Sequence, residues 1–449
     1  MTDPDLLVIG GGAAAISAAR SARRFGKTVV MVTDGPPGGD CTFNGCVPSK
    51  TLLASAGEPF GDAMARVQRT VAGIAAAESV AVLEHEGIEV VLGRAVFTGP
   101  GNVQVDGRIL SSRKLVVATG SSPVVPKLPG LESIDYLTNE TMFGLTKAPR
   151  HLAVLGGGAI GCEMAQAFRG LGCEVTVLES ADRILSKEEP EASEVVHAAL
   201  TRRGIDLRVT TKVEAVERTD GGIKIVTDKG SFEASHLLVA VGRTPSAAGL
   251  EPLGLALTKQ GGVQVDLRMR TSVKNVYAAG DVTGRLPFTH AADEMGRIAA
   301  TSALTRKPLK FAESAVPWVT FTDPEVARIG LTEAQAAEQH KDARVVELPM
   351  SELDRARTSG RTEGFVKLIV GPKPLTRNIG GGRVLGATIV AERAGEMMAE
   401  VALVMRSGLL VGRLAQTSHS YPTWSMAVQQ AAGQLFGFGD RKPRPARAS

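Results

Sequence analysis

Residues 38–50 read GGDCTFNGCVPSK and place Cys41 and Cys46 five positions apart. On a regular α-helix, residues at this spacing are separated by roughly 7.5 Å along the axis and lie on different faces. The Cα atoms of a disulfide lie within about 7 Å of each other, so a bridge between these cysteines requires a helix that begins late or is distorted. Pro48 agrees with this, because proline is tolerated in a first turn or at a kink. A bridge held in this way would be readily reduced.

Two other interpretations of the cysteine pair are two buried thiols and half of a zinc site. A zinc site needs two more ligands. Cys162 and Cys173 stand far along the chain, and the seven histidines do not gather near any of the four cysteines. From these residues alone, a redox-active pair and a pair of buried thiols both stay open.

The composition is typical of a globular protein with several domains. The chain has 449 residues, of which 43% are apolar and 22% charged, and a chain of this length holds roughly two to four domains. Its 51 basic and 47 acidic side chains nearly balance, and the first basic run is the terminal RKPRPARAS. We expect this tail to be a disordered end. We expect no nucleic-acid partner for the protein.

We expect no targeting or membrane segment in this chain. The apolar LLVIGGGAAA near the N-terminus follows Asp3 and Asp5 rather than basic residues, which favours a buried strand and turn over a signal peptide. No apolar run reaches the length that spans a membrane. Four cysteines are too few for a secreted disulfide framework. We therefore expect a cytoplasmic protein without membrane contact.

A glycine-rich turn near the N-terminus has the pattern of a dinucleotide-binding unit. A short apolar run, residues 6–12, leads into Gly10, Gly12 and Ala15, and small residues continue at helical spacing. In this strand–turn–helix fingerprint, the glycines let the backbone approach a pyrophosphate at the helix N-terminus. The run therefore predicts a bound dinucleotide.

Two strand ends offer further contacts to that nucleotide. The second predicted strand, residues 28–32, should be followed by an acid for the ribose, but Thr33 stands there, followed by Asp34. Either side chain can hydrogen-bond the adenosine ribose. A later strand runs into Thr119 and Gly120, which is either a second close approach of the backbone or a plain turn at a strand end.

The fingerprint then repeats. Gly156, Gly158 and Gly161 follow an apolar run, and Glu179 stands 23 residues after Gly156 at the end of a predicted strand. Two such units predict two nucleotides side by side, and the second should hold the nicotinamide nucleotide, because hydride entry and a redox pair need different cofactors. Glu179 can bind both ribose hydroxyls but repels a 2′-phosphate, and its neighbour is Ser180 rather than an arginine. This favours NADH, with NADPH as the alternative.

The remaining chain supplies further strands. Asp281 follows the predicted strand 275–279, where its carboxylate can accept from a ribityl or ribose hydroxyl. From about residue 315 the pattern becomes that of an antiparallel sheet with helices such as residues 396–406, which predicts an α+β domain without a nucleotide signature. The expected strands outside the fingerprints are residues 88–92, 95–97, 102–105, 114–118, 316–321, 345–348, 364–370 and 384–390.

Taken together, these motifs resemble the FAD-dependent pyridine nucleotide-disulfide oxidoreductases, which include dihydrolipoamide dehydrogenase, glutathione reductase and mercuric reductase. The resemblance runs nearly end to end and rests on GGGAAA, GGDCTFNGCVPSK, ATGSSP, LGGGAIGCEMA, AVGRTP, YAAGDVTG, FTDPEVARIGLTE and HSYPTWSM. It implies an α/β fold with two Rossmann-like dinucleotide-binding domains plus a C-terminal α+β dimerisation domain. The implied boundaries are residues 1–148 and 271–312 for the FAD-binding domain, 149–270 for the NAD-binding domain and 313–449 for the dimerisation domain.

The same resemblance assigns roles to the central residues. Cys46 would be the thiol beside the flavin, and Cys41 the interchange thiol that meets the substrate. Lys50 would form an ion pair with Glu163 beside the flavin. The protein would be a homodimer in which one C-terminal domain completes the partner's active site. Nucleotide contacts are expected at Gly10, Gly12, Ala15, Thr33, Asp34, Gly39, Asp40, Lys50, Ala95, Thr119, Gly120, Gly156, Gly158, Gly161, Glu179, Gly242, Asp281, Thr289 and His290.

The chain departs from the disulfide reductases at their C-terminal acid–base motif, H-x-H-P-T-x-x-E. Tyr421 replaces the second histidine and Met426 replaces the glutamate, so we expect no carboxylate beside Tyr421. A tyrosine with a pKa near 10 donates a proton but is a poor base at neutral pH. His419 is the alternative acid–base, although in an extended segment it would lie about 6 to 7 Å away along the strand.

These departures favour a mercuric-reductase-like enzyme that passes electrons from NADH through FAD and the cysteine pair to a metal ion or a small disulfide. We expect neither the N-terminal metal-binding domain nor the C-terminal cysteine pair of those enzymes, and no resident metal site. Asp40 replaces a usual threonine beside Cys41 and would, if it has no partner, raise the thiol pKa. The alternatives are a dihydrolipoamide dehydrogenase-type disulfide reductase and a flavin-binding subunit that turns over slowly.

Overall fold

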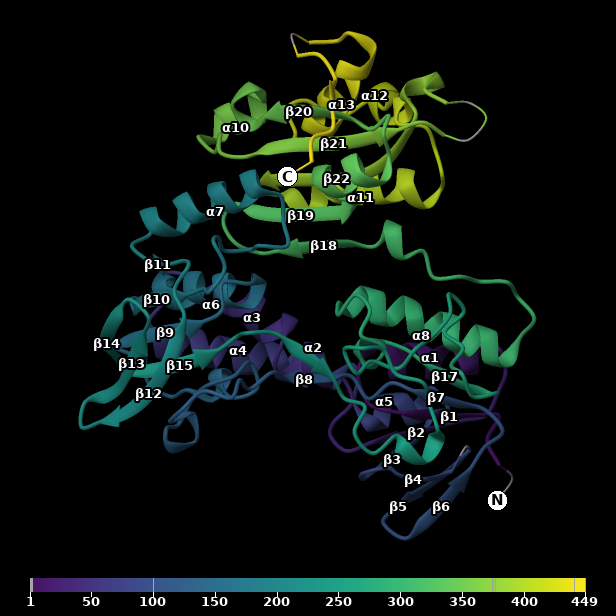
Figure 1. The fold of residues 1–449 in the computed structure, drawn as a ribbon. Helices are drawn as coiled ribbons and strands as arrows, with labels where there is room; N and C mark the ends of the chain where they lie inside the picture. Colours follow the sequence, from purple (N-terminus) through teal and green to yellow (C-terminus); the bar gives the residue numbers. More distant parts are fainter. Residues whose placement is uncertain (1–2, 100, 374, 376, 440, 449) are drawn as a thin grey trace.

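The computed structural model describes residues 3–99, 101–373, 375, 377–439 and 441–448. Two α/β units lie side by side, and an antiparallel C-terminal unit lies across both of them (Figure 1). This is the expected fold class. Within the described ranges, no helix is long and apolar enough to cross a membrane.

The first unit is built on a parallel sheet in the order β17-β7-β1-β2-β3. Its central strand, β1 (Leu6–Ile9), is buried along its whole length, as expected for a parallel strand covered on both faces. On one face, α1 and α8 touch so closely that a Cβ added to Gly296 would lie 2.1 Å from the Ala14 carbonyl oxygen. The other strands are β2 (Val29–Thr33), β3 (Glu89–Leu92), β7 (Leu115–Val117) and β17 (Val276–Ala278), and the helices are α1 (Ala13–Arg24), α2 (Gly39–Phe43), α3 (Cys46–Leu53), α4 (Phe60–Ala76), α5 (Val80–His85) and α8 (Thr289–Leu304).

The second unit repeats this arrangement with a parallel sheet in the order β11-β10-β9-β15. A three-stranded antiparallel sheet packs beside it. Cys162 and Cys173 lie in the buried core of this unit. Its elements are β9 (His151–Leu155), α6 (Ala159–Gly170), β10 (Glu174–Leu178), α7 (Pro190–Arg202), β11 (Asp206–Arg208), β12 (Val213–Thr219), β13 (Gly222–Thr227), β14 (Gly230–Ala234) and β15 (His236–Val239).

Two short sheets extend the first unit and connect it to the second. The hairpin strand β6 was not expected from the sequence, because residues 106–111 carry polar and charged side chains between few apolar ones. The pair β8–β16 joins the segment after β7 to the segment that returns from the second unit, with Arg243 opposite Pro123. These strands are β4 (Val96–Gly99), β5 (Asn102–Val105), β6 (Arg108–Ser111), β8 (Ser121–Pro123) and β16 (Arg243–Pro245).

The C-terminal unit is a six-stranded sheet in the order β18-β19-β22-β21-β20-β23, antiparallel at every pairing. This confirms the predicted antiparallel pattern, although β19 lies between two of the expected strands and was not predicted. Its elements are β18 (Pro317–Thr320), β19 (Glu325–Gly330), α9 (Glu333–Gln339), β20 (Arg344–Pro349), α10 (Asp354–Ser359), β21 (Phe365–Gly371), β22 (Arg383–Ala391), α11 (Ala394–Arg406), α12 (Gly412–Gln416), α13 (Met426–Gly433) and β23 (Arg444–Pro445).

The basic tail is ordered where the structure describes it, contrary to the expected disordered end. Strand β23 pairs with β20, and Arg444 forms an ion pair with Glu333. Glu333 also lies 3.2 Å from Lys367 Nζ, which is fully buried and contacts Glu191 at 2.9 Å. Because Glu191 belongs to α7, this buried network joins the tail, the C-terminal sheet and the second unit.

Candidate active site

A cavity of about 2740 Å³ lies between the three units, and residues from all of them line it. This volume exceeds the roughly 300–1,000 Å³ of ordinary ligand pockets, so it has room for two dinucleotides. Most residues singled out in the sequence line this one cavity: Gly10, Gly12, Thr33, Asp34, Gly39, Asp40, Cys41, Cys46, Lys50, Ala95, Thr119, Gly120, Gly156, Gly158, Glu163, Glu179, Gly242, Asp281, Thr289 and His290.

Three of the predicted site residues do not line the cavity. Ala15 is fully buried behind it. A Cβ added to Gly161 would lie 1.9 Å from the Gly156 carbonyl oxygen, so Gly161 permits close packing of helix against strand rather than contact with a ligand. Tyr421 is 70% exposed on the C-terminal unit.

The turn before α1 fits the diphosphate of a dinucleotide such as FAD. Gly10 has φ +126°, and a Cβ there would lie 2.1 Å from the Ala118 carbonyl oxygen. The N-terminus of α1 has no side-chain cap and no acidic residue in its first turn. Its backbone N–H groups are therefore available to an anion, which the helix dipole also favours.

At the end of β2, the two candidate ribose contacts differ. The Thr33 hydroxyl donates to the Gly35 carbonyl oxygen at 2.9 Å, so its proton is already used within the turn. Asp34 is exposed and also lines the cavity. Its carboxylate oxygens are the more accessible acceptors for ribose hydroxyls.

The turn before α6 repeats these features. Gly156 has φ +111°, and a Cβ there would lie 2.5 Å from the Ala240 carbonyl oxygen. The N-terminus of α6 again has neither a side-chain cap nor an acid in its first turn. Glu179 closes this turn, because its carboxylate accepts from the N–H of Gly157 at 2.7 Å and of Ala181 at 2.8 Å. These residues could hold the diphosphate and ribose of a second nucleotide.

The cysteine pair lies where the helix is interrupted, which is the geometry that a bridge at this spacing would need. Helix α2 ends at Phe43, and α3 begins at Cys46. Pro48 falls in the first turn of α3. Both cysteines are free thiols in the structure, with Cys41 half-buried and Cys46 exposed to the cavity.

The two thiols differ in acidity. A hydrogen bond from Cys41 stabilises the Cys46 thiolate and, with the Thr289 hydroxyl and the Lys50 charge, lowers the pKa of Cys46 to about 6. The same interaction and burial raise the pKa of Cys41. The Thr289 hydroxyl lies 3.3 Å from the Cys46 sulfur. At neutral pH the pair is therefore one thiolate, Cys46, and one thiol, Cys41, which favours the redox interpretation over two buried thiols.

Lys50 and Glu163 form the ion pair that the resemblance implied. Lys50 Nζ lies 2.7 Å from Glu163 Oε2, and Glu163 Oε1 accepts from the Phe321 N–H at 2.9 Å. Lys50 Nζ also lies 4.5 Å from the centroid of the Phe321 ring. The contacts join α3, α6 and the segment after β18 next to Cys46.

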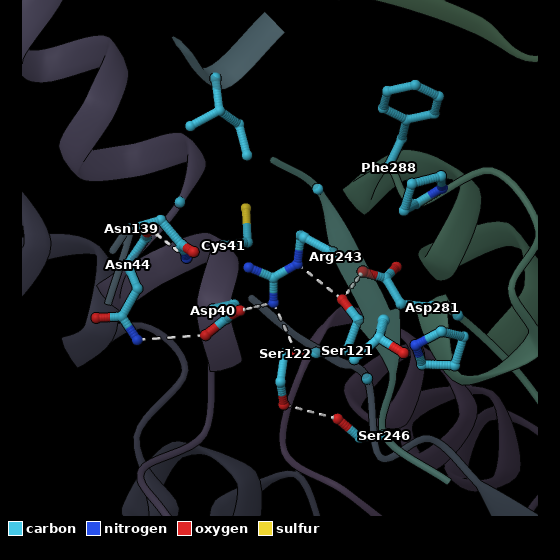
Figure 2. A pocket seen from close by; sticks show the side chains of 18 of the residues that line it. Asp40, Cys41, Asn44, Ser121, Ser122, Asn139, Arg243, Ser246, Asp281 and Phe288 are labelled. Atoms are coloured by element: carbon cyan, nitrogen blue, oxygen red, sulfur yellow. Dashed lines mark hydrogen bonds and ion pairs between the residues drawn. The ribbon is translucent and has the colours of Figure 1, made fainter. Parts of the chain in front are cut away.

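Arg243 was not predicted as a site residue, although it lies within the quoted AVGRTP motif. It forms an ion pair with Asp40, and its Nε donates to the Ser121 hydroxyl at 2.8 Å, which in turn donates to Asp281 at 2.7 Å (Figure 2). Asp40 therefore has a cationic partner. An Asp40 without a partner was expected to raise the pKa of the neighbouring Cys41 thiol, and this does not apply. The sequence contains no signal for this pairing, since 203 residues separate its members.

Two residues near the C-terminus differ from expectation. The Tyr421 hydroxyl donates to the Asp354 carboxylate at 3.1 Å, which raises the pKa of Tyr421, so the expectation that no carboxylate stands beside Tyr421 was wrong. The ring nitrogens of His419 lie 2.9 Å from the Thr417 carbonyl oxygen and 3.0 Å from Glu400. Both nitrogens face acceptor oxygens, so His419 is poorly placed to exchange a proton with a substrate.

Comparisons with known proteins agree with this geometry. Residues 4–296 match the family model "Pyridine nucleotide-disulphide oxidoreductase", and residues 316–432 match its dimerisation domain. The chain is 37% identical to mercuric reductase of Streptomyces lividans over 463 residues, covering 96% of both chains. It is 31% identical to dihydrolipoyl dehydrogenase of Bacillus subtilis over 466 residues, covering 97% of both chains.

Solved structures show the same fold. The Cu(II) complex of the HOCl-induced flavoprotein disulfide reductase RclA from Escherichia coli superposes with a TM-score of 0.88 at 29% identity, covering 96% of this chain and 99% of that one. The chain therefore belongs to the pyridine nucleotide-disulphide oxidoreductase family and is an NAD(P)H-dependent flavoprotein oxidoreductase.

Proposed function

We propose that the protein uses NADH to reduce a soft metal ion such as the mercuric ion, or a small disulfide, with Cys41 and Cys46 as its redox-active pair. In this proposal, residues 1–148 and 271–312 bind FAD, residues 149–270 bind the nicotinamide nucleotide, and residues 313–449 form the dimerisation domain. Bound FAD supplies the two-electron redox chemistry that connects a nicotinamide with a dithiol. For a metal ion, the balance is NADH and Hg²⁺ to NAD⁺, Hg⁰ and H⁺.

The observation that carries the proposal is the thiolate–thiol pair at the break between α2 and α3. With a pKa of about 6, Cys46 is ionised at neutral pH, and Cys41 keeps its proton. Lys50 favours the negative charge on Cys46, and Glu163 holds Lys50 in place. In the reduced enzyme these residues can bind a soft cation as thiolates or attack a disulfide.

The C-terminal residues favour a metal ion over a disulfide as acceptor. Reduction of a disulfide releases a thiolate that needs a proton, and acid–base help of this kind accelerates a reaction by roughly 10² to 10⁴. The Tyr421 hydroxyl already donates a hydrogen bond to Asp354, which raises the pKa of Tyr421, so Tyr421 is a weak proton donor at neutral pH. Its oxygen lone pairs can still face a cation. RclA, a flavoprotein disulfide reductase of the same fold, forms a Cu(II) complex, so one relative of this chain binds a metal ion.

The proposed enzyme is a homodimer in which Tyr421 reaches the cavity of the partner subunit. Two observations support this: the match to a dimerisation domain and apolar side chains on the surface of the C-terminal unit. Ile379 and Phe438 are each 70% exposed, and Phe436 is 43% exposed. Large apolar side chains that are exposed on the same unit are costly to leave in water, and they are consistent with an interface there.

NADH oxidation with two acceptors tests the proposal. The wild type should turn over with mercuric ion and a thiol buffer, and only slowly with lipoamide. Tyr421→Phe should weaken turnover of the mercuric ion, whereas Tyr421→His should raise turnover of lipoamide, because imidazole carries a proton at neutral pH. Cys41→Ser and Cys46→Ser are controls that should stop both reactions. Fast lipoamide turnover by the wild type would contradict the metal-ion proposal.

A dihydrolipoamide dehydrogenase-type activity is the second candidate. The likeness to dihydrolipoyl dehydrogenase of Bacillus subtilis favours it. In this candidate His419 would be the acid–base, and it would give up its present contact with the Thr417 carbonyl oxygen or with Glu400 to meet a substrate. In that case His419→Gln should abolish lipoamide turnover and leave the thiol acidity of Cys46 unchanged. If the protein is an enzyme of this type, the Tyr421→Phe variant should keep most of its lipoamide turnover.

A further inference from the structure

Two carboxylates of the cavity share one guanidinium group. Arg243 forms an ion pair with Asp40 and donates to the backbone oxygen of Ser121 at 2.7 Å. Its Nε donates a hydrogen bond to the Ser121 hydroxyl, and this hydroxyl in turn donates a hydrogen bond to the Asp281 carboxylate. Figure 2 shows the chain of contacts running across the cavity from α2, through β16 and β8, to the segment after β17. The Arg243 side chain is only 17% exposed.

The charge balance of this group depends on Arg243. Asp40 and Asp281 each carry a negative charge when ionised, and Arg243 is the cation in contact with Asp40. Burial raises the pKa of Asp281, and the charge of Arg243 acts against this rise while that of Asp40 adds to it. Loss of Arg243 would leave two carboxylates in one cavity without their common counter-charge.

Asp40 also lies beside the turn that fits a diphosphate. A Cβ added to Gly39 would lie 2.7 Å from Gly12 Cα, so the residue before Asp40 is in contact with Gly12, the residue that immediately precedes α1. An anion at the N-terminus of α1 and an uncompensated carboxylate at Asp40 would repel each other, since a like charge near a bound anion lowers affinity. The asparagine side chain of Asn44 supplies a further hydrogen bond to Asp40 at 3.2 Å but no charge.

We propose that Arg243 is a positioning residue for the cofactor: it neutralises Asp40 and thereby allows the cavity to accept the diphosphate of FAD. The inference rests on the proposed FAD site. This role differs from a mechanical one, in which the ion pair only holds α2 against β16. In a mechanical role, loss of either Arg243 or Asp40 would weaken FAD binding. In charge compensation, loss of Arg243 weakens FAD binding only while Asp40 is present.

Reconstitution of the apoprotein separates these roles, with the quenching of flavin fluorescence as a measure of FAD affinity. Arg243→Gln should weaken FAD binding about tenfold or more, because one partner of a half-buried charge pair is removed. The Asp40→Asn variant should bind FAD at least as tightly as the wild type, because the Arg243 charge then acts on the diphosphate without its carboxylate partner. The double variant Asp40→Asn/Arg243→Gln should recover most of the affinity lost in Arg243→Gln. Raising the salt concentration should also recover part of it, because salt screens the repulsion.

A control variant and two outcomes distinguish charge compensation from a mechanical tie. Arg270 forms an ion pair with Asp266 on the surface, so Arg270→Gln is a matched control that should leave FAD affinity unchanged, and thermal unfolding of each apoprotein checks the fold. Equal losses in Asp40→Asn, Arg243→Gln and the double variant would overturn charge compensation. So would wild-type affinity in Arg243→Gln. A wild type that binds no FAD would instead overturn the proposed function itself.

Discussion

Lys50 Nζ lies 2.7 Å from Glu163 Oε2. This ion pair joins α3, which begins at Cys46, to α6, which follows the second nucleotide turn. The glutamate side chain is 7% exposed and the lysine side chain 35%. The ion pair therefore fixes a positive charge close to the reactive thiolate, inside the cavity, and ties its position to both α/β units.

Removal of this charge should make Cys46 less acidic. Lys50→Met should raise the pKa of Cys46 by about one unit, because a nearby opposite charge favours the thiolate. Glu163→Gln should lower it, since the carboxylate acts in the opposite direction. The rate of Cys46 alkylation by iodoacetamide, followed against pH by peptide mass spectrometry, reports the midpoint. Lys341→Met, on the surface, is the matched control, and an unchanged midpoint in Lys50→Met would contradict the assigned role.

The thiolate should be visible in the FAD-bound enzyme as a long-wavelength absorption band after two-electron reduction. Cys46→Ser should abolish the band, whereas Cys41→Ser should show it without reduction. In the wild type the band should fade as the pH falls through about 6, because Cys46 then gains a proton. In Cys41→Ala it should fade at a higher pH, because the hydrogen bond that contributes most to the acidity of Cys46 is lost. The reverse pattern between the two serine variants would mean that the roles of the cysteines are exchanged.

Glu179 should make NADH the better reductant. The wild type is expected to show a higher kcat/KM with NADH than with NADPH, because the carboxylate at the end of β10 repels a 2′-phosphate. The Glu179→Gln substitution should lower the ratio of kcat/KM with NADH to kcat/KM with NADPH about tenfold. The glutamine oxygen can still accept from the Gly157 N–H. Steady-state rates with both nucleotides at several concentrations give the two ratios. Equal efficiency with both in the wild type would show that Glu179 does not control this choice.

The tail network should make stability depend on pH. Burial acts to raise the pKa of Glu333, but the hydrogen bond from Arg444 and the charge of Lys367 outweigh it and lower that pKa to about 2 from 4.5. Glu333 therefore stabilises the fold above about pH 4.5, and this contribution is lost as the pH falls toward 2. At pH 7, Glu333→Gln should cost about 3 kcal/mol in the free energy of unfolding, because it breaks a buried ion pair.

Denaturant unfolding of the wild type and Glu333→Gln at pH 7, 4.5 and 3 measures this dependence. The difference between the two proteins should shrink steadily as the pH falls. Arg444→Ala should destabilise in the same direction, whereas Arg441→Ala, whose partner Glu352 is an exposed surface residue, should change the free energy of unfolding by less than about 1 kcal/mol. A pH-independent difference would exclude the assigned ionisation of Glu333.

Local patterns in the sequence determined the two nucleotide turns, the break at the cysteine pair and the antiparallel C-terminal unit. These features follow from neighbours in the chain. Gly10 and Gly156 need a positive φ and leave no space for a Cβ, and a disulfide between Cys41 and Cys46, five residues apart, would not fit a regular helix. Such constraints act over a few residues, so the residue types alone express them.

Contacts between distant segments were decided only by the tertiary structure. Asp40 meets Arg243, Tyr421 meets Asp354, and the tail meets Glu333. Charged and polar side chains have many possible partners in a sequence. Which of them meet depends on how β8 pairs with β16, how α10 is placed, and how β23 adds to β20. Because the energy of an ion pair depends on distance and burial rather than on sequence separation, these partners became known only once the fold had brought them together.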